Sequence, residues 1–153
     1  MIYEFRYVHN ALGTDLGNIV AVTAFEIPGF DDLDSATQNR LEEAARKVCM
    51  HVAAAQPRFI SPETVPQTTV EQEKDIIREQ VKRMNKPDNV VEKIVEGRLR
   101  KFYSEACLLQ QEFVVGEGEG MTVGEWLEKV AKECEIPKIS ISDYGLLICG
   151  EHS

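Results

Sequence analysis

The residues of this chain that most often bind metals or carry redox chemistry are widely spaced. Cysteine occurs at positions 49, 107, 134 and 149, so no pair has C-x-x-C spacing, and the sequence contains only three histidines. Cys49 and Cys107 fall in apolar helical patterns, where a free thiol behaves as a small hydrophobic side chain. The sequence therefore predicts no metal site and no cofactor, and the cysteines favour a reducing compartment.

A glycine-rich stretch at 116–120, GEGEG, is the remaining candidate for binding an anion. A phosphate loop of the P-loop type needs a lysine, whereas this stretch has none and its glutamates would repel phosphate. Hydrolase and zinc-protease motifs are absent from the sequence, and the acidic pairs at 31–32 and 42–43 lie on polar stretches rather than in a predicted cleft. We therefore predict a flexible break at 116–120, no catalytic residues, and a protein that is not an enzyme.

Two histidines occur in contexts that predict different environments. His51 lies beside Val48 and Val52 in an apolar helical pattern, which favours an interior position. His9 ends a predicted strand at a turn-rich stretch, where side chains are exposed and can bind a partner. An ordinary strand-end residue is the alternative for His9, and the residues alone do not decide between the two.

The composition is that of a globular protein with an acidic balance. The chain has 153 residues and a formal net charge of −9, which disfavours binding to a phosphate backbone. No apolar run approaches the ~20 residues of a membrane-spanning helix, and the first residues do not form a signal peptide. We expect no direct contact with nucleic acid and no membrane span.

Hydrophobic periodicity indicates an α+β fold. Alternating apolar residues predict strands at 2–9, 18–26 and 138–149, and helical spacing predicts helices at 36–55, 69–84, 88–107 and a short one after 122. Asp34 or Ser35 can cap the first helix, and the string TVGE at 122–125 has the spacing of a capping box.

A short link containing Pro87 joins the second and third helices, so they must pack antiparallel. We expect Ile77, Val81, Leu99 and Phe102 to seal this helical hairpin. The predicted fold is a three-stranded antiparallel sheet packed with helices on one side, plus a projecting antiparallel coiled-coil hairpin. Residues 1–153 are expected to form one domain, with the hairpin at 69–107 as an insertion.

Several strings resemble the elongation factor Ts family, the guanine-nucleotide exchange factors of elongation factor Tu. KVCMHVAAAQPRFI at 47–60 resembles the family's M-H-V-A-A-x-x-P-x-[FY] segment. In register with it are SPETVP at 61–66, KP at 86–87, VEKIVEGRLRKF at 91–102, LLQQEFV at 108–114, and, upstream, YVHN at 7–10 followed by GNIVAV at 17–22. The last two correspond to the family's Y-[IV]-H and the strand that follows it. The resemblance covers nearly the whole chain.

The resemblance implies a partner, a mechanism and contact residues. Such a factor binds elongation factor Tu and assists exchange by preferring the nucleotide-free form. The histidine of Y-x-H contacts that partner in the family, so His9 and Asn10 are expected partner contacts. The family's T-D-F-V motif wedges near the partner's magnesium site; the nearest string here is TAFE at 23–26, which keeps Phe25 as a third expected contact and lacks the aspartate.

These departures set the expected activity. The sequence shows no counterpart of the family's amino-terminal helical domain, so we expect binding to elongation factor Tu with impaired GDP/GTP exchange. The alternative is a Ts-like structural subunit of a ribosome-associated or other complex without exchange activity. A homodimer is left open. The expected location is the cytoplasm of a bacterium, or a mitochondrion or plastid.

Overall fold

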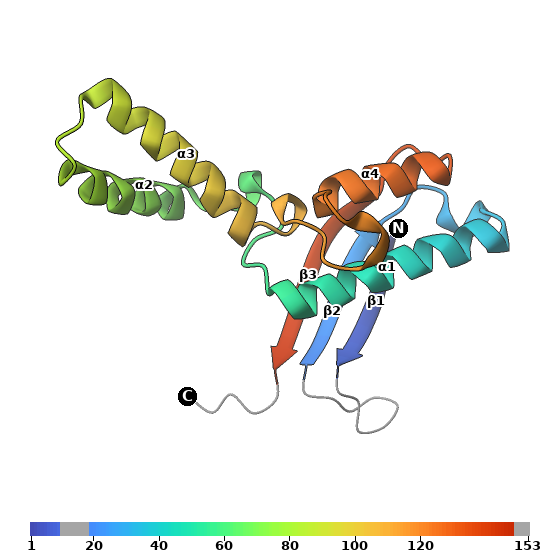
Figure 1. Ribbon diagram of the computed structural model, residues 1–153. Coiled ribbons are helices and arrows are strands. Elements are labelled where there is room, and N and C mark those ends of the chain that lie inside the picture. The colour runs from blue at the N-terminus through green and yellow to red at the C-terminus, as the bar shows by residue number, and fades with distance from the viewer. Residues whose placement is uncertain (10–18, 149–153) are drawn as a thin grey trace. The chain divides into compact units, whose positions relative to one another are not determined.

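A computed structural model describes residues 1–9 and 19–148 of the chain (Figure 1). Contacts between residues divide the chain into two compact units. The sheet unit comprises residues 1–56 and 112–153, and the hairpin unit comprises residues 57–111. The predicted α+β class is confirmed, and each unit has its own apolar core.

The sheet unit is built on three antiparallel strands in the order β1-β2-β3. They are β1 (Ile2–His9), β2 (Ile19–Glu26) and β3 (Ser140–Ile148). In the central strand β2, the alternate residues Ala21, Thr23 and Phe25 are buried, because successive side chains of a strand point to opposite faces. Helix α1 (Ser35–Ala55) packs on β1 and β2, and helix α4 (Val123–Glu133) contacts α1. The sequence predicted all five elements with ends shifted by at most a few residues.

Local capping fixes where the helices of the sheet unit begin and end. Asp34 caps α1, since its carboxylate accepts hydrogen bonds from the amides of Ala36 and Thr37 at 2.9 and 3.0 Å. Gln56 ends α1 in the left-handed region, at φ 46°, directly before a proline. Thr122 opens α4 with the predicted capping box, in which the side chains of Thr122 and Glu125 each bond the other's backbone amide.

The stretch 116–120 is folded rather than a simple break. Residues Gly116–Gly118 form a single turn of 3-10 helix, and Gly118 is buried. A Cβ atom added at Gly118 would overlap the ring of Phe113, which is itself 2% exposed. The prediction of a flexible linker was wrong here, because the glycine at 118 is required by close packing rather than by chain flexibility.

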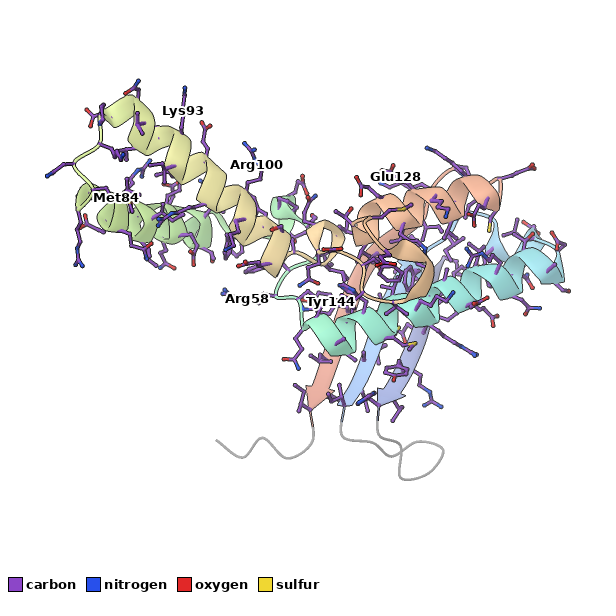
Figure 2. All side chains as sticks on the ribbon, in the orientation of Figure 1. Arg58, Met84, Lys93, Arg100, Glu128 and Tyr144 are labelled. Carbon is purple, nitrogen blue, oxygen red and sulfur yellow. The ribbon has the colours of Figure 1, made fainter. Side chains whose placement is uncertain are left out.

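The hairpin unit contains helices α2 (Gln67–Lys82) and α3 (Asp88–Ala106), which run in opposite directions (Figure 1). Figure 2 marks Met84 in the turn between them, where its side chain is 50% exposed. Short 3-10 helices at Pro62–Thr64 and Leu108–Gln110 flank the pair.

Two separate apolar clusters hold the hairpin together. Ile77 and Val81 of α2 pack with Val95 of α3. Leu99 and Phe102 instead pack against a second cluster, with Val65, Val70 and Cys107 at its centre. The four residues predicted to seal the hairpin are therefore divided between two clusters, because α3 meets the later turns of α2 in one cluster and, in the other, the first turn of α2 together with the connector before it.

Candidate functional site

A hollow of about 460 Å³ opens in the sheet unit where β1 and β2 meet the carboxyl end of α1. We call it the His9 groove. Its lining consists of Tyr7, His9, Ile19, Met50, Ala53, Ala54, Gln56, Val114 and Val115. None of these residues carries a carboxylate, an ammonium or a guanidinium group. A mostly apolar hollow with a few polar groups at its edge is typical of a binding site.

His9 occupies this groove in the exposed position that the sequence predicted. It is the last residue of β1 and pairs with Ile19 at the start of β2. A hydrogen bond of 3.0 Å joins the hydroxyl of Tyr7 to Nδ1 of His9. When the Tyr7 hydroxyl donates this bond, the ring proton lies on Nε2, which is then available to donate to an acceptor on a partner.

The other side of the groove is formed by segments distant in sequence from His9. Met50, Ala53 and Ala54 share one face of α1, since residues three and four apart lie above one another on a helix. Met50 is 36% exposed and Val114 is 61% exposed. Exposed apolar side chains gathered at a hollow mark interaction sites more often than isolated ones do.

Met50 and Val114 were not predicted from the sequence as residues of a binding site. Met50 lies outside the stripe of apolar residues through which α1 packs on the core. This position is the local signal in the sequence that its side chain does not face the core. Val114 follows the buried Phe113 in a short apolar run, and only the fold shows that its side chain is exposed.

The other two predicted contact residues have different outcomes. Asn10 lies outside the described residues. Phe25 is 1% exposed in β2, where its ring packs edge-on against Phe5 at a centroid distance of 5.8 Å. A side chain that is enclosed in this way presents no surface to a partner, so we propose no partner contact for Phe25.

His51 is fully buried in α1, as predicted. Its Nδ1 accepts a hydrogen bond of 3.3 Å from the backbone amide of Val114, and its ring lies 5.6 Å from that of Phe113. His51 therefore belongs to the core, but it contacts the backbone of a residue that lines the His9 groove.

Cys49 and Cys107 act as packing residues. Cys49 is fully buried, and its sulfur lies 3.3 Å from the carbonyl oxygen of Phe5 and 3.4 Å from the hydroxyl of Thr23. Burial raises the pKa of the Cys49 and Cys107 thiols, so both stay uncharged near neutral pH. Neither thiol has the lowered pKa of a reactive cysteine.

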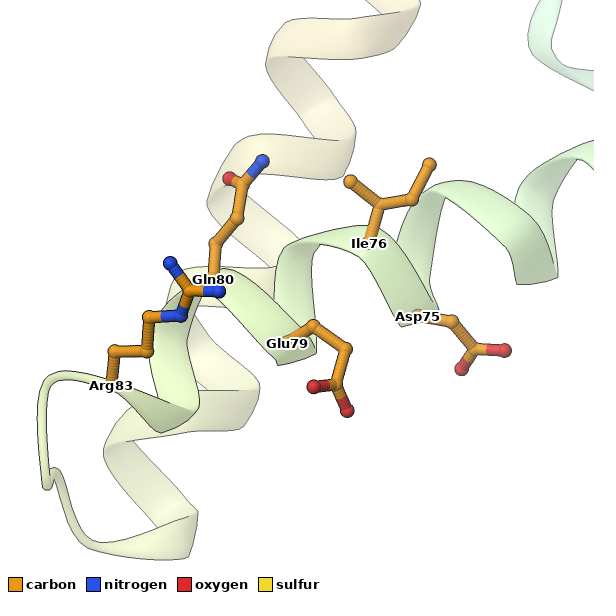
Figure 3. A pocket seen from close by; sticks show the side chains of 5 residues that line it. All are labelled: Asp75, Ile76, Glu79, Gln80 and Arg83. Atoms are coloured by element: carbon orange, nitrogen blue, oxygen red, sulfur yellow. The ribbon is translucent and has the colours of Figure 1, made fainter.

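A second hollow, of about 400 Å³, lies on the hairpin unit (Figure 3). Asp75, Ile76, Glu79, Gln80 and Arg83 line it, and all five belong to or directly follow α2 (Figure 3). A surface made by one helix has no opposing wall, so it encloses a ligand less well than the His9 groove. A third hollow, of about 190 Å³, is lined by residues of β1, β2 and β3, among them Glu4 and Asp143.

Within residues 1–9 and 19–148, no group of histidine, cysteine or acidic side chains could hold a metal ion. Among the same residues, no helix is both long and apolar enough to cross a membrane.

Comparison with known proteins identifies the family. Residues 3–147 match the family described as Elongation factor TS. Elongation factor Ts of Paramagnetospirillum magneticum is 36% identical over 145 residues, covering 95% of this chain and 43% of that protein. Elongation factor Ts of Caulobacter sp. is 39% identical over 145 residues, with the same coverage, and that of Petrotoga mobilis is 42% identical over 100 residues, covering 64% of this chain and 51% of that protein.

The chain spans about half the length, or less, of these relatives. The matched region nevertheless includes both units, from the first strand to the last. The chain therefore belongs to the elongation factor Ts family.

Proposed function

We propose that this chain binds elongation factor Tu through the His9 groove. Family membership supports the choice of partner, and the position of His9 supports the choice of surface. The single observation that carries the proposal is the meeting of an exposed histidine with exposed apolar side chains around one hollow. A partner segment that fits it inserts an apolar side chain and offers a hydrogen-bond acceptor to His9.

Any nucleotide exchange that the chain promotes arises from differential binding, in which no covalent bond is made or broken. A protein that binds nucleotide-free elongation factor Tu more tightly than the GDP-bound form weakens GDP binding by the same factor. A protein with equal affinity for both forms shifts nothing, however tightly it binds. The extent of exchange therefore depends on contacts that only one form of the partner can make.

We propose that such contacts are weak in this chain. The string at 23–26 has Ala24 where the family's wedge motif has an aspartate, and Phe25 is enclosed in the core. Phe25 is therefore not available as an aromatic wedge for the nucleotide site of a partner. The expected behaviour is binding to both forms of elongation factor Tu with similar affinity and slow exchange.

Stopped-flow release of a fluorescent GDP from elongation factor Tu tests this proposal. Adding the chain should accelerate GDP release far less than a full-length elongation factor Ts does at the same concentration. Acceleration comparable to the full-length factor would refute slow exchange. A parallel pull-down, in which the tagged chain fails to retain elongation factor Tu in either nucleotide state, would refute the binding itself.

A further inference from the structure

The buried imidazole of His51 accepts a hydrogen bond from the backbone of a residue at the surface. His51 is 0% exposed, and its Nδ1 accepts from the amide of Val114, which is a residue of the His9 groove. Accepting at Nδ1 requires the ring proton to lie on Nε2. The ring is held in place by Phe113, which stacks on Trp126 at a centroid distance of 4.4 Å.

This hydrogen bond joins two parts of the groove lining. His51 adjoins Met50 and shares a helical turn with Ala53 and Ala54, and these three neighbours line the groove from α1. Val114 and Val115 line it from a segment without helix or strand structure. The distance between the α1 side of the groove and the side formed by Val114 and Val115 therefore depends on the hydrogen bond between His51 and Val114.

The chain around Val114 is anchored firmly on one side. The amide of Phe113 donates to the carbonyl of Met121 at 2.8 Å, and Glu112 forms a β-bridge with Thr122. These contacts fix the chain as far as Phe113. At the next residue, the amide of Val114 donates to the imidazole of His51. His51 therefore holds the backbone at the point where the chain enters the groove.

We propose that His51 is a positioning residue for partner binding, which fixes the backbone of Val114 and thereby the width of the His9 groove. The inference rests on the proposed function of that groove. A purely structural histidine would contribute to the stability of the core, whereas a positioning histidine also determines affinity for elongation factor Tu.

Two variants at position 51 separate these roles. His51→Phe keeps an aromatic ring in the core but removes the acceptor. His51→Asn restores an acceptor close to the position of Nδ1 and loses part of the ring. Leu41→Ala is the matched control, because Leu41 is 1% exposed in the same helix and does not line the groove.

Two measurements apply to each variant: amide hydrogen exchange at Val114 by NMR, relative to other core amides, and affinity for elongation factor Tu by calorimetric titration. In His51→Phe, relative exchange at Val114 should rise and affinity should fall, each by roughly two- to tenfold, which is the effect of one lost hydrogen bond. His51→Asn should recover part of both. Leu41→Ala should lower the melting temperature but change neither the relative exchange at Val114 nor the affinity for elongation factor Tu.

The outcomes distinguish this inference from the proposed function. If the wild-type chain binds and His51→Phe binds equally well, the positioning role is overturned and the proposed function stands. Unchanged relative exchange at Val114 in His51→Phe also overturns the positioning role. If the wild-type chain does not bind elongation factor Tu, both fail. Should His51→Phe not fold, His51→Leu removes the acceptor with a smaller side chain, and the same expectations apply.

Discussion

At the scale of single residues, the His9 groove depends on close packing just beneath its surface. The ring of Phe113 packs with the rings of both His51 and Trp126, and the next residue, Val114, is exposed in the groove. Gly118 packs directly on the Phe113 ring. A change in any of these buried contacts is therefore transmitted over a single peptide unit to the groove.

Gly118→Ala tests this packing. The added methyl group would overlap Phe113, whose ring is already packed with those of His51 and Trp126, so the variant should lose about 1–3 kcal/mol of stability by overpacking. Gly97→Ala is the opposite case, since its Cβ would meet no atom within 4 Å in the middle of α3. It should gain about 0.5–1 kcal/mol from helix propensity. Urea unfolding of both variants measures these changes in the free energy of unfolding. If both variants change stability in the same direction, the packing described for Gly118 and Gly97 is wrong.

At the scale of elements, the start of α1 depends on a charged cap. Hydrogen bonds from the hydroxyl and then the amide of Thr37 hold the pKa of Asp34 below its ordinary value. A carboxylate with a lowered pKa in the folded state stabilises the protein at pH values above its unfolded pKa of about 3.9. That contribution is lost as the pH falls through the lower folded value.

Asp34→Ala should accordingly lower the melting temperature near pH 7, and the difference from wild type should shrink as the pH falls below the unfolded pKa of about 3.9. Asp34→Asn serves as the control, because asparagine caps helices about as well as aspartate without carrying a charge. Thermal melts across this pH range provide the measurement. A difference between Asp34→Ala and wild type that stays constant with pH would show that the charge of Asp34 contributes nothing to the cap.

The two clusters of the hairpin unit make a separate prediction. Phe102 is only half-buried against the cluster around Val70, so Phe102→Ala should cost about 1–3 kcal/mol, less than the 3–5 of an enclosed ring. Val95 is 2% exposed in the other cluster and lies about 10 Å away along α3. Changes that share no partner add, so the Phe102→Ala and Val95→Ala double variant should match the sum within about 0.5 kcal/mol. A larger deviation would mean that the clusters act as one.

At the scale of the whole molecule, local signals predicted the elements and long-range packing decided the site. The strands, the Asp34 cap and the capping box of Thr122 follow from residues a few positions apart, so the sequence predicted them. The His9 groove joins residues near positions 9, 50 and 114, which no local pattern connects. The burial of Phe25 was missed for a related reason: a motif resemblance specifies residue types, whereas exposure depends on what packs above the strand.

The central claim, that the chain binds elongation factor Tu through the His9 groove, is tested most directly by calorimetric titration. The wild-type chain and its His9→Ala variant are each titrated into elongation factor Tu in the GDP-bound and in the nucleotide-free form. The wild-type chain should give saturable binding with similar affinity for both forms. His9→Ala should bind more weakly by at least about fivefold, or ~1 kcal/mol, while its stability changes by no more than ~0.5 kcal/mol because the side chain is exposed. His9→Gln, which keeps a donor near the position of Nε2, should bind more tightly than His9→Ala. The absence of saturable binding, or a His9→Ala variant that loses stability and keeps full affinity, would contradict the account.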